Sequence, residues 1–416
     1  MTAATNGTDG AGRGTGAVGG CLKPLAGLLG MLLLIGGVIA AVILPDSGYA
    51  PGFSMAKVWD APYEGDATDD GGEVRLAGDA VVRGRSDGVT AFDVRSGKKR
   101  WEYAVPDRAQ TCAMSSDPAA GVVLVAYREA RPEEKDCVTV AAVDLADGRE
   151  RWRADGVEAD FLDNVVTAGG GLGVLPDGHR LRAVDLKTGA PRWTVPLPQN
   201  CDPHDLALAP KQVVAALMCG TEARLIAYDP ANGTARWNVP VDARHGVDKD
   251  AELRVLSADP PAVRVFEADG KTSAVLAYGT DGRVRARIAG AGDYGRLMGT
   301  SVEGGRLFAS AWTGSGESTS FSGIVAFDLA SGEQLWRTKV AGDDFDVRDG
   351  RVTTVRAHRH GDLLTVLDAA TGDEEDDRPF RDAEVRSVAG VLTHQDLVIL
   401  AHADDGMPPF SVYERW

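Results

Sequence analysis

At 416 residues the chain is long enough for two or three ordinary domains, or for one repeat architecture that uses the whole length. Its composition is 44% apolar and 6% aromatic, which suffices for a large globular core. A net charge of -17 repels phosphate backbones and anionic lipid surfaces, and no concentrated basic stripe offsets that charge. These properties exclude nucleic-acid binding from the functions we expect.

The first apolar segment lies near the N-terminus. Residues 25–44 read LAGLLGMLLLIGGVIAAVIL, which is close to the ~20 uncharged residues that a helix needs to cross a bilayer. Arg13 and Lys23 precede this run and Asp46 follows it, so the positive-inside rule places the N-terminus in the cytoplasm. We therefore expect a disordered cytoplasmic tail at 1–22, a transmembrane signal anchor at 23–45, a linker at 46–55 and an extracytoplasmic domain at 56–416.

Two other interpretations of this segment stay open at the level of the sequence. The tetrapeptide at 18–21 resembles a lipoprotein cleavage box, although such a box follows the apolar stretch and this one precedes it. A cleaved signal peptide would end near 45–50, but its apolar region usually has about 7 to 15 residues. A retained anchor in the cell membrane fits the order and length of the segments best.

Four cysteines follow the apolar segment: Cys112, Cys137, Cys201 and Cys219. An even number outside the cytoplasm favours two disulfides, for which three connectivities are open. The residues between Cys201 and Cys219 predict a hairpin that turns near Pro210 and brings these two cysteines level. We therefore favour Cys201 with Cys219, which leaves Cys112 with Cys137. No C-x-x-C pair occurs, so a metal site at the cysteines is not expected.

One pattern, A-x-D-x-x-x-G-x-x-x-W, occurs five times, as AFDVRSGKKRW, AVDLADGRERW, AVDLKTGAPRW, AYDPANGTARW and AFDLASGEQLW. The apolar residues before the Asp predict a strand, the Asp can accept backbone N–H bonds in the turn, and the Gly supplies the positive φ of that turn. We expect the Trp to pack against the next repeat. The residues of this structural motif are Asp93, Gly97, Trp101, Asp144, Gly148, Trp152, Asp185, Gly189, Trp193, Asp229, Gly233, Trp237, Asp328, Gly332 and Trp336.

Weaker copies complete the series. AYGTDGRVRAR and VLDAATGDEED, the second with Asp368 and Gly372, keep the strand and turn but lack the tryptophan, and an eighth copy stops short at Val412–Glu414. From Asp93 to Glu414 the spacing is 321 residues over seven steps, or about 46 per repeat, as in four-stranded propeller blades. The orphan strand AKVWD at 56–60 predicts the missing piece. We expect Trp59 to be the eighth motif tryptophan and its strand to close the ring.

These motif copies resemble the tryptophan-docking repeat of the quinoprotein (PQQ-repeat) propellers, over residues 56–416. The resemblance implies an all-β fold, an eight-bladed quinoprotein-like β-propeller preceded by one transmembrane helix. That family contains PQQ-dependent alcohol and glucose dehydrogenases as well as non-catalytic propellers of the BamB type, which assemble outer-membrane proteins. The dehydrogenases use a central Ca²⁺, an aspartate base and often a pair of adjacent cysteines. Here no two cysteines are adjacent and no catalytic aspartate can be matched.

The non-catalytic, BamB-like branch is therefore the closer match, and we expect no catalytic residues, no cofactor and no metal site. His358 and His360 lack a third ligand in sequence, and the acidic stretches at 343–349 and 373–377 lack Ca²⁺-loop spacing and are expected to be solvated loops. The expected function is protein-binding or scaffolding at the cell envelope, with an unknown protein or glycan partner held by loops at 128–137 or 313–323. The alternative is a PQQ-dependent dehydrogenase or a ligand sensor that uses the propeller funnel.

Overall fold

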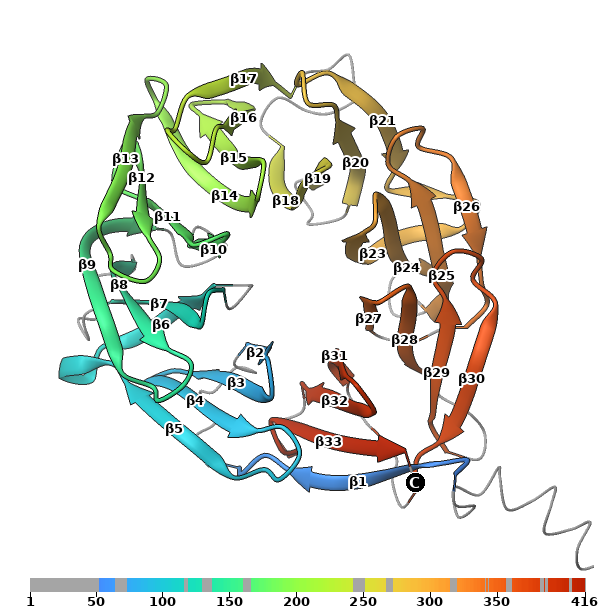
Figure 1. Cartoon of the computed structure of the whole chain (residues 1–416). Helices are drawn as coiled ribbons and strands as arrows, with labels where there is room; N and C mark the ends of the chain where they lie inside the picture. The colour runs from blue at the N-terminus through green and yellow to red at the C-terminus, as the bar shows by residue number, and fades with distance from the viewer. Residues whose placement is uncertain are drawn as a thin grey trace, which may run out of the picture.

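The computed structural model describes residues 52–415 except 64–72, 116–118, 129–136, 160–165, 242–250, 267–271, 315–319, 341, 343, 357–360, 382–384, 386–387 and 404–405. These residues form eight antiparallel sheets arranged in a ring, together with one 3-10 turn, η1 (Pro106–Arg108). The expected all-β, eight-bladed propeller is confirmed (Figure 1). No helix in this part of the chain is long and apolar enough to cross a membrane, and the predicted anchor lies outside it.

We number the blades in chain order and name the strands of each from the axis outward. Blades 1 to 4 follow one four-stranded pattern. Their strands are β2 (Val74–Ala77), β3 (Ala80–Arg85), β4 (Gly88–Asp93) and β5 (Lys99–Ala104); β6 (Gln110–Met114), β7 (Val122–Arg128), β8 (Cys137–Asp144) and β9 (Glu150–Ala159); β10 (Thr167–Gly169), β11 (Leu172–Pro176), β12 (Arg180–Asp185) and β13 (Pro191–Pro196); and β14 (Cys201–Ala209), β15 (Gln212–Cys219), β16 (Glu222–Tyr228) and β17 (Ala235–Pro240).

Blades 5 to 8 repeat the pattern, with a short extra strand in blade 6. Their strands are β18 (Glu252–Ala258), β19 (Pro261–Phe266), β20 (Thr272–Tyr278) and β21 (Val284–Ala289); β22 (Ala291–Gly292), β23 (Gly295–Glu303), β24 (Arg306–Thr313), β25 (Ser320–Asp328) and β26 (Gln334–Arg337); β27 (Phe345–Arg348), β28 (Arg351–Arg356), β29 (Leu363–Asp368) and β30 (Glu374–Pro379); and β31 (Val388–His394), β32 (Leu397–His402), β33 (Phe410–Arg415) and β1 (Met55–Asp60).

The N-terminal strand closes the ring, as the sequence predicts. β1 pairs antiparallel with β33, with Met55 opposite Arg415 and Asp60 opposite Ser411. It is thereby the outermost strand of blade 8, on the rim of the ring (Figure 1). The Trp59 ring packs edge-on against Phe410 of its own blade at 5.2 Å between centroids, and also contacts Phe92 of blade 1. One side chain thus holds the first and last blades together.

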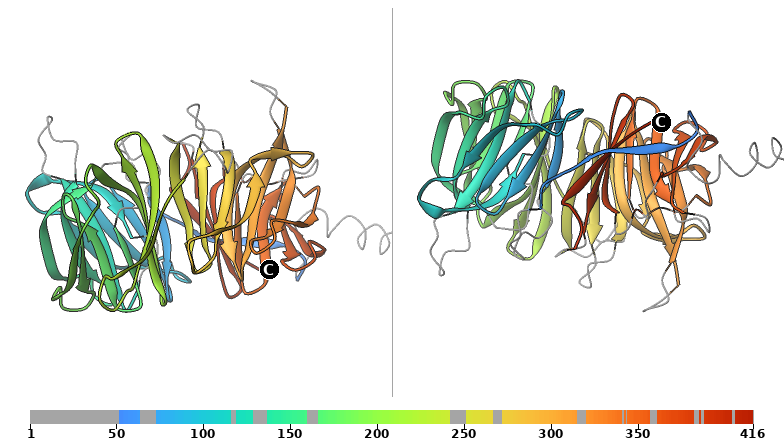
Figure 2. Two further views of the ribbon diagram at one scale, coloured as in Figure 1. Left: turned by 90° about the horizontal axis from the view of Figure 1, so that it is seen from above. Right: turned by 90° about the horizontal axis from the view of Figure 1, so that it is seen from below.

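The hydrophobic core is divided among the wedges between neighbouring blades. The middle strands are buried on both faces, so they read as continuous apolar runs instead of alternating patterns. In β7, for example, every residue from Val122 to Tyr127 is buried. The cluster around Trp101 and Val89 of blade 1 includes Val123 and Val125 of blade 2, so the two sheets share one core. Viewed from the side, the blades form a flat ring with turns on its two faces (Figure 2).

Each motif tryptophan lies on the motif glycine of the next blade. A Cβ atom added to Gly148 would come within 2.7 Å of the Trp101 ring, and Gly148 has φ +72°, so only glycine fits there. Trp101 Nε1 also donates to the Leu145 carbonyl at 2.7 Å. The same ring-on-glycine contact joins Trp59 to Gly97, Trp152 to Gly189, Trp193 to Gly233, Trp237 to Gly282 and Trp336 to Gly372.

Each contact between a motif strand and the motif turn of the next blade forms a joint between the two blades. Where the motif copy lacks its tryptophan, this joint is of a different kind. Ala286 takes the place of the tryptophan in blade 5, and it faces Gly332 with 3.2 Å from its Cβ to a Cβ built on that glycine. In the blade 5 turn, one residue fewer separates the strand from Gly282. Trp237 Nε1 consequently finds no carbonyl and is buried without a hydrogen-bond partner in the described part of the chain. Blade 7 has Asp376 at the tryptophan position, where it pairs with Arg378 at 2.7 Å.

Candidate functional site

Two kinds of turn gather on one face of the ring, which we call the turn face. One is the hairpin between the first and second strands of a blade, and the other is the motif turn between the third and fourth. The two are hydrogen-bonded to each other: Val94 N donates to Asp79 O at 3.0 Å in blade 1, and Leu186 N to Gly171 O at 2.9 Å in blade 3. The turn face is therefore a rigid platform, on which small differences between blades determine the surface.

The motif aspartates hold their turns together. Asp93 Oδ1 accepts from Ser96 N at 2.8 Å, and Asp93 Oδ2 accepts from Arg100 at 2.7 Å. The hydrogen bonds from Arg100 and Ser96 hold the pKa of Asp93 well below its usual value. Sequence reasoning missed the arginine, although each of the first four motif copies ends in Arg-Trp. The equivalent ion pairs are Arg151–Asp144, Arg192–Asp185 and Arg236–Asp229.

A cavity of about 660 Å³ opens on the turn face between blades 3 and 4. Its walls are the hairpin turns at 169–171 and 209–211 and the motif turn at 229–231. Leu172, Leu208 and Pro230 supply an apolar lining. A cavity with an apolar lining and nearby charges can receive side chains of a binding partner or a small ligand.

Gly169 keeps this cavity open. Gly169 has no positive φ, and a Cβ there would meet Leu208 at 3.4 Å, an ordinary contact, so neither the backbone nor packing requires glycine. The absence of a side chain leaves Leu208 accessible from the cavity. In every blade the equivalent position is the last residue that pairs across the first hairpin before its turn. In the other seven blades this residue has a side chain: Ala77, Ala119, Ala209, Ala258, Glu303, Arg348 and His394.

Three cations surround the apolar lining. Arg192 and Arg236 come from the outer strands of blades 3 and 4, and Lys211 from the blade 4 hairpin. Each is exposed and holds one framework carboxylate; Lys211, for instance, bridges to Asp259 of blade 5 at 2.9 Å. Arg192 and Arg236 each engage their aspartate through a single nitrogen, and a guanidinium carries five N–H donors. The cavity can therefore offer further donors to an acidic group.

A second hollow of about 400 Å³ adjoins the first on the side of the ring axis and shares Leu208 and Ala209 with it. Its shape depends on a buried carboxylate. A bulge in β14 turns Asp205 inward, where its Oδ1 accepts from Leu206 N at 2.9 Å and its Oδ2 from Val255 N of blade 5 at 2.6 Å. This contact fixes the first strands of blades 4 and 5 relative to each other, so the two hollows form one rigid depression.

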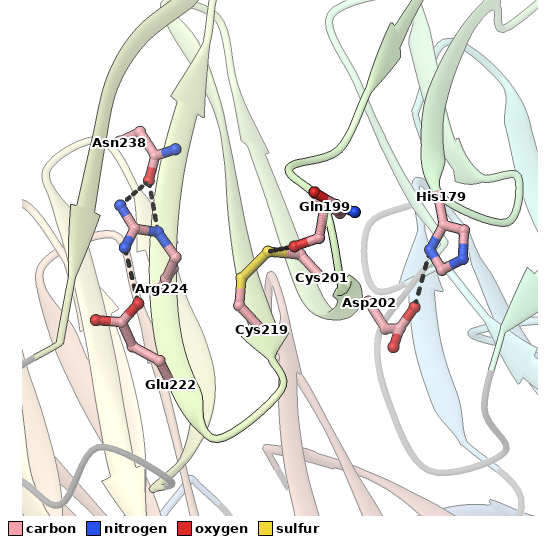
Figure 3. Close-up of a disulfide and its surroundings, with 8 residues drawn as sticks. All are labelled: His179, Gln199, Cys201, Asp202, Cys219, Glu222, Arg224 and Asn238. Carbon is pink, nitrogen blue, oxygen red and sulfur yellow. Dashed lines mark hydrogen bonds and ion pairs between the residues drawn. A yellow bond between two sulfur atoms is a disulfide. The ribbon is translucent and has the colours of Figure 1, made fainter.

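Both favoured disulfides are formed. Cys201 lies directly opposite Cys219 across β14 and β15, on a hairpin that turns at 210–211 (Figure 3). Cys112 is bonded to Cys137. Near the first disulfide, Arg224 bridges Glu222 and Asn238, whereas His179 pairs with Asp202 (Figure 3). The disulfides link the first strand of blade 4 to its second and the first strand of blade 2 to its third, and they do not line the cavity.

The other sequence candidates do not form a second site. His358, His360 and most of the two loops proposed for partner binding lie outside the described residues. The acidic stretches at 343–349 and 373–377 were expected to be loops, and this is wrong, because most of the first forms the inner strand β27 and most of the second forms the outer strand β30. Arginines neutralise the charge of β30, with Arg351 on Glu375 at 3.0 Å and Arg356 on Asp377. In the part of the chain that the structure describes, no three His, Cys, Asp or Glu side chains gather as they would around a metal ion.

Comparison with known proteins places the fold. Among solved structures, BamB from Moraxella catarrhalis is 15% identical, with a TM-score of 0.51 over 86% of this chain and 97% of that one. The quinohemoprotein alcohol dehydrogenase ADHIIG from Pseudomonas putida HK5 is 13% identical, with a TM-score of 0.53 over 89% and 79%. A europium-containing methanol dehydrogenase is 11% identical, with a TM-score of 0.50 over 84% and 85%. At such identities these likenesses describe the fold and not the activity.

A family model provides the closer assignment. No curated protein sequence matches the chain. The model described as outer membrane protein assembly factor BamB matches residues 121–293 and 272–407, well over half of the sequence. That match covers the blades that form the cavity and the motif turns that support it. The chain therefore belongs to the BamB-like family of PQQ-repeat β-propellers.

Proposed function

We propose that this propeller is a non-catalytic protein-binding module, held outside the cytoplasm by the apolar segment at 25–44, and that its partner docks on the blade 3–4 cavity. The observation that carries the proposal is Gly169, a glycine that neither φ nor packing demands and that exposes an apolar pocket. The BamB-like family supports protein binding in general terms. The pocket adds a place and a chemistry: an apolar side chain of the partner, with an acidic neighbour facing the three cations.

A photo-crosslinking experiment in intact membranes tests the proposal. The photoreactive residue p-benzoylphenylalanine replaces Ala231, which lines the cavity on the motif turn. The matched control replaces Ala330, the exposed residue at the same motif position in blade 6. We expect a protein adduct from position 231 and none from 330. Equal adducts at both positions, or none at either, would contradict the proposal.

A pocket-filling variant shows whether the adduct depends on the cavity. Gly169→Leu should reduce the adduct formed at position 231 at least tenfold, because the leucine occupies the space over Leu208. Ala77→Leu places the same side chain on the equivalent hairpin of blade 1 and should leave the adduct unchanged. Thermal unfolding of both variants checks that the fold is intact.

The rival enzyme or sensor function predicts instead that PQQ with Ca²⁺ raises the melting temperature of the full chain by many degrees.

A further inference from the structure

Exposed apolar side chains are unevenly distributed over this propeller. Among the described residues, five large hydrophobic side chains are exposed, and three of them fall between positions 53 and 63. Phe53 is 63% exposed, Val58 is 37% exposed and Tyr63 is 59% exposed. The others, Met298 and Leu335, lie in blade 6. Single exposed apolar residues need no explanation, whereas three within one segment of eleven residues call for one.

All three side chains belong to the strand that closes the ring and to its flanks. Phe53 lies just before β1, next to blade 7, where Arg378 donates to the Gly52 carbonyl at 2.7 Å. Tyr63 follows β1 at the side of blade 1. Because β1 is the outermost strand of blade 8, it runs along the rim of the ring (Figure 1); Val58 belongs to this strand, and Phe53 and Tyr63 flank its two ends. We call this set the rim patch.

The backbone of β1 explains how the rim patch forms. Lys57 is opposite Tyr413 and Trp59 is opposite Val412, so Val58 is an extra residue in a β-bulge. A bulge shifts the alternation of side chains by one residue. Trp59 can therefore pack inward between blades 8 and 1 while both Lys57 and Val58 face outward. The bulge turns an edge strand, which would otherwise alternate, into a surface with consecutive exposed side chains.

We propose that the rim patch rests on the interfacial region of a zwitterionic lipid bilayer. The proposal rests on the proposed anchor at 25–44. Residues 45–51 separate that segment from Gly52, and eight Cα–Cα steps cannot span more than about 29 Å. Among the described residues, this part of the rim is therefore the nearest to the anchor along the chain. An aromatic ring with a polar tip favours the level of the lipid headgroups, which suits Tyr63, and the wholly apolar ring of Phe53 suits the boundary between the headgroups and the acyl chains.

The charge of the molecule selects the kind of lipid. A net charge of -17 disfavours an anionic surface. On the same strand as Val58, Lys57 is paired with Asp60 at 3.2 Å, so the charge beside the rim patch is balanced. Zwitterionic headgroups match such a balanced surface. In this orientation the propeller stands on its edge, with the ring axis parallel to the membrane, and the turn face stays open to a partner.

Spin labels at the rim test this contact in the full chain. Cys21→Ser removes the one cysteine of the sequence that is not in either disulfide, and single cysteines then replace Phe53, Tyr63 or, as a control, Ala235. Ala235 is exposed on β17, the outer strand of blade 4, four blades away from β1. In phosphatidylcholine nanodiscs, labels at 53 and 63 should show an oxygen-to-nickel-chelate accessibility ratio several times that at 235. Equal ratios at the three positions would overturn the lipid contact.

Two further outcomes are distinguishable. Labels at 53 and 63 that are shielded from both reagents would show a protein covering the rim patch, such as a second copy of this chain, and would also overturn the proposal. Carbonate extraction of cell membranes tests the anchor separately. A chain that washes out contradicts the anchor and with it the membrane half of the proposed function. A chain that stays in the membrane while its labels behave like the label at 235 contradicts the rim contact alone.

Discussion

Single residues decide how tightly neighbouring blades can approach each other. The motif glycines combine two demands, because their φ is positive and the ring of a tryptophan lies where a Cβ would be. Either demand alone costs free energy when another residue is introduced, by roughly 1–2 kcal/mol for the left-handed backbone and about 1–3 kcal/mol for overpacking. Glycines on the hairpins, such as Gly121, carry only the first demand.

Gly148→Ala should therefore lower the free energy of unfolding by about 2–4 kcal/mol. Gly121→Ala is the matched control, because Gly121 has φ +77°, close to the +72° of Gly148, yet has nothing within 4 Å of an added Cβ. The free energy of unfolding of Gly121→Ala should fall by only about 1 kcal/mol, which is the backbone contribution. Urea unfolding measures both. Equal decreases in the free energy of unfolding would show that the Trp101 ring moves to accommodate the added Cβ at no cost in free energy.

The joints between blades are the elements that the sequence predicts best. Repeated spacing reveals the tryptophans and glycines, and the count of motifs requires that a strand near the N-terminus close the ring, as β1 does. The binding cavity could not be predicted in this way. It depends on Gly169 of one blade facing Leu208 of the next, a pairing that becomes apparent only when two repeats are placed side by side. The arginine partners were in principle readable from the Arg-Trp pairs.

The joint between blades 5 and 6 offers a test of the docking rule. A Cβ built on Gly332 lies 3.2 Å from the Ala286 Cβ, close to the 2.9 Å and 3.1 Å from the Trp101 and Trp152 Cβ atoms at their glycines. Ala286→Trp should therefore place an indole over Gly332 and raise the free energy of unfolding by about 1–2 kcal/mol. Trp336→Ala at the next joint should lower it by about 3–5 kcal/mol. Chemical unfolding of the two variants measures both free energies. A lower free energy of unfolding in Ala286→Trp would show that the space over Gly332 is already filled.

At the scale of the whole molecule, the repeated motif aspartates link stability to pH. Hydrogen bonds within the turns lower the pKa of each motif carboxyl in the folded chain, and in the first four copies an arginine donates a further one; for Asp144 the donors are Ala146 N and Arg151. A carboxyl whose folded pKa lies below its unfolded value of about 3.9 stabilises the fold above that pH and loses the effect as pH falls through the folded pKa. The framework under the turn face is therefore acid-sensitive at every repeat that keeps the motif.

Asp144→Asn isolates one such contribution. The asparagine can still accept from Ala146 N but carries no charge for Arg151. The melting temperature of this variant should lie below that of the wild-type protein at pH 5 to 8, and the gap should narrow as the pH falls below about 4. Differential scanning calorimetry between pH 7 and pH 2 measures the gap. A gap that does not change with pH would show that the ionised state of Asp144 does not contribute.

The closing strand also imposes an order in time. Met55 pairs with Arg415, so the outermost strand of blade 8 and the strand beside it are joined by residues 360 positions apart in the chain. At about 5–20 residues per second, synthesis places roughly 20–70 s between the appearance of the two strands. During that interval β1 has no neighbour, and Trp59 has no finished joint to enter. Ring closure therefore cannot precede the synthesis of β33, and any nascent chain that lacks β33 leaves β1 unpaired and open to chaperones and proteases.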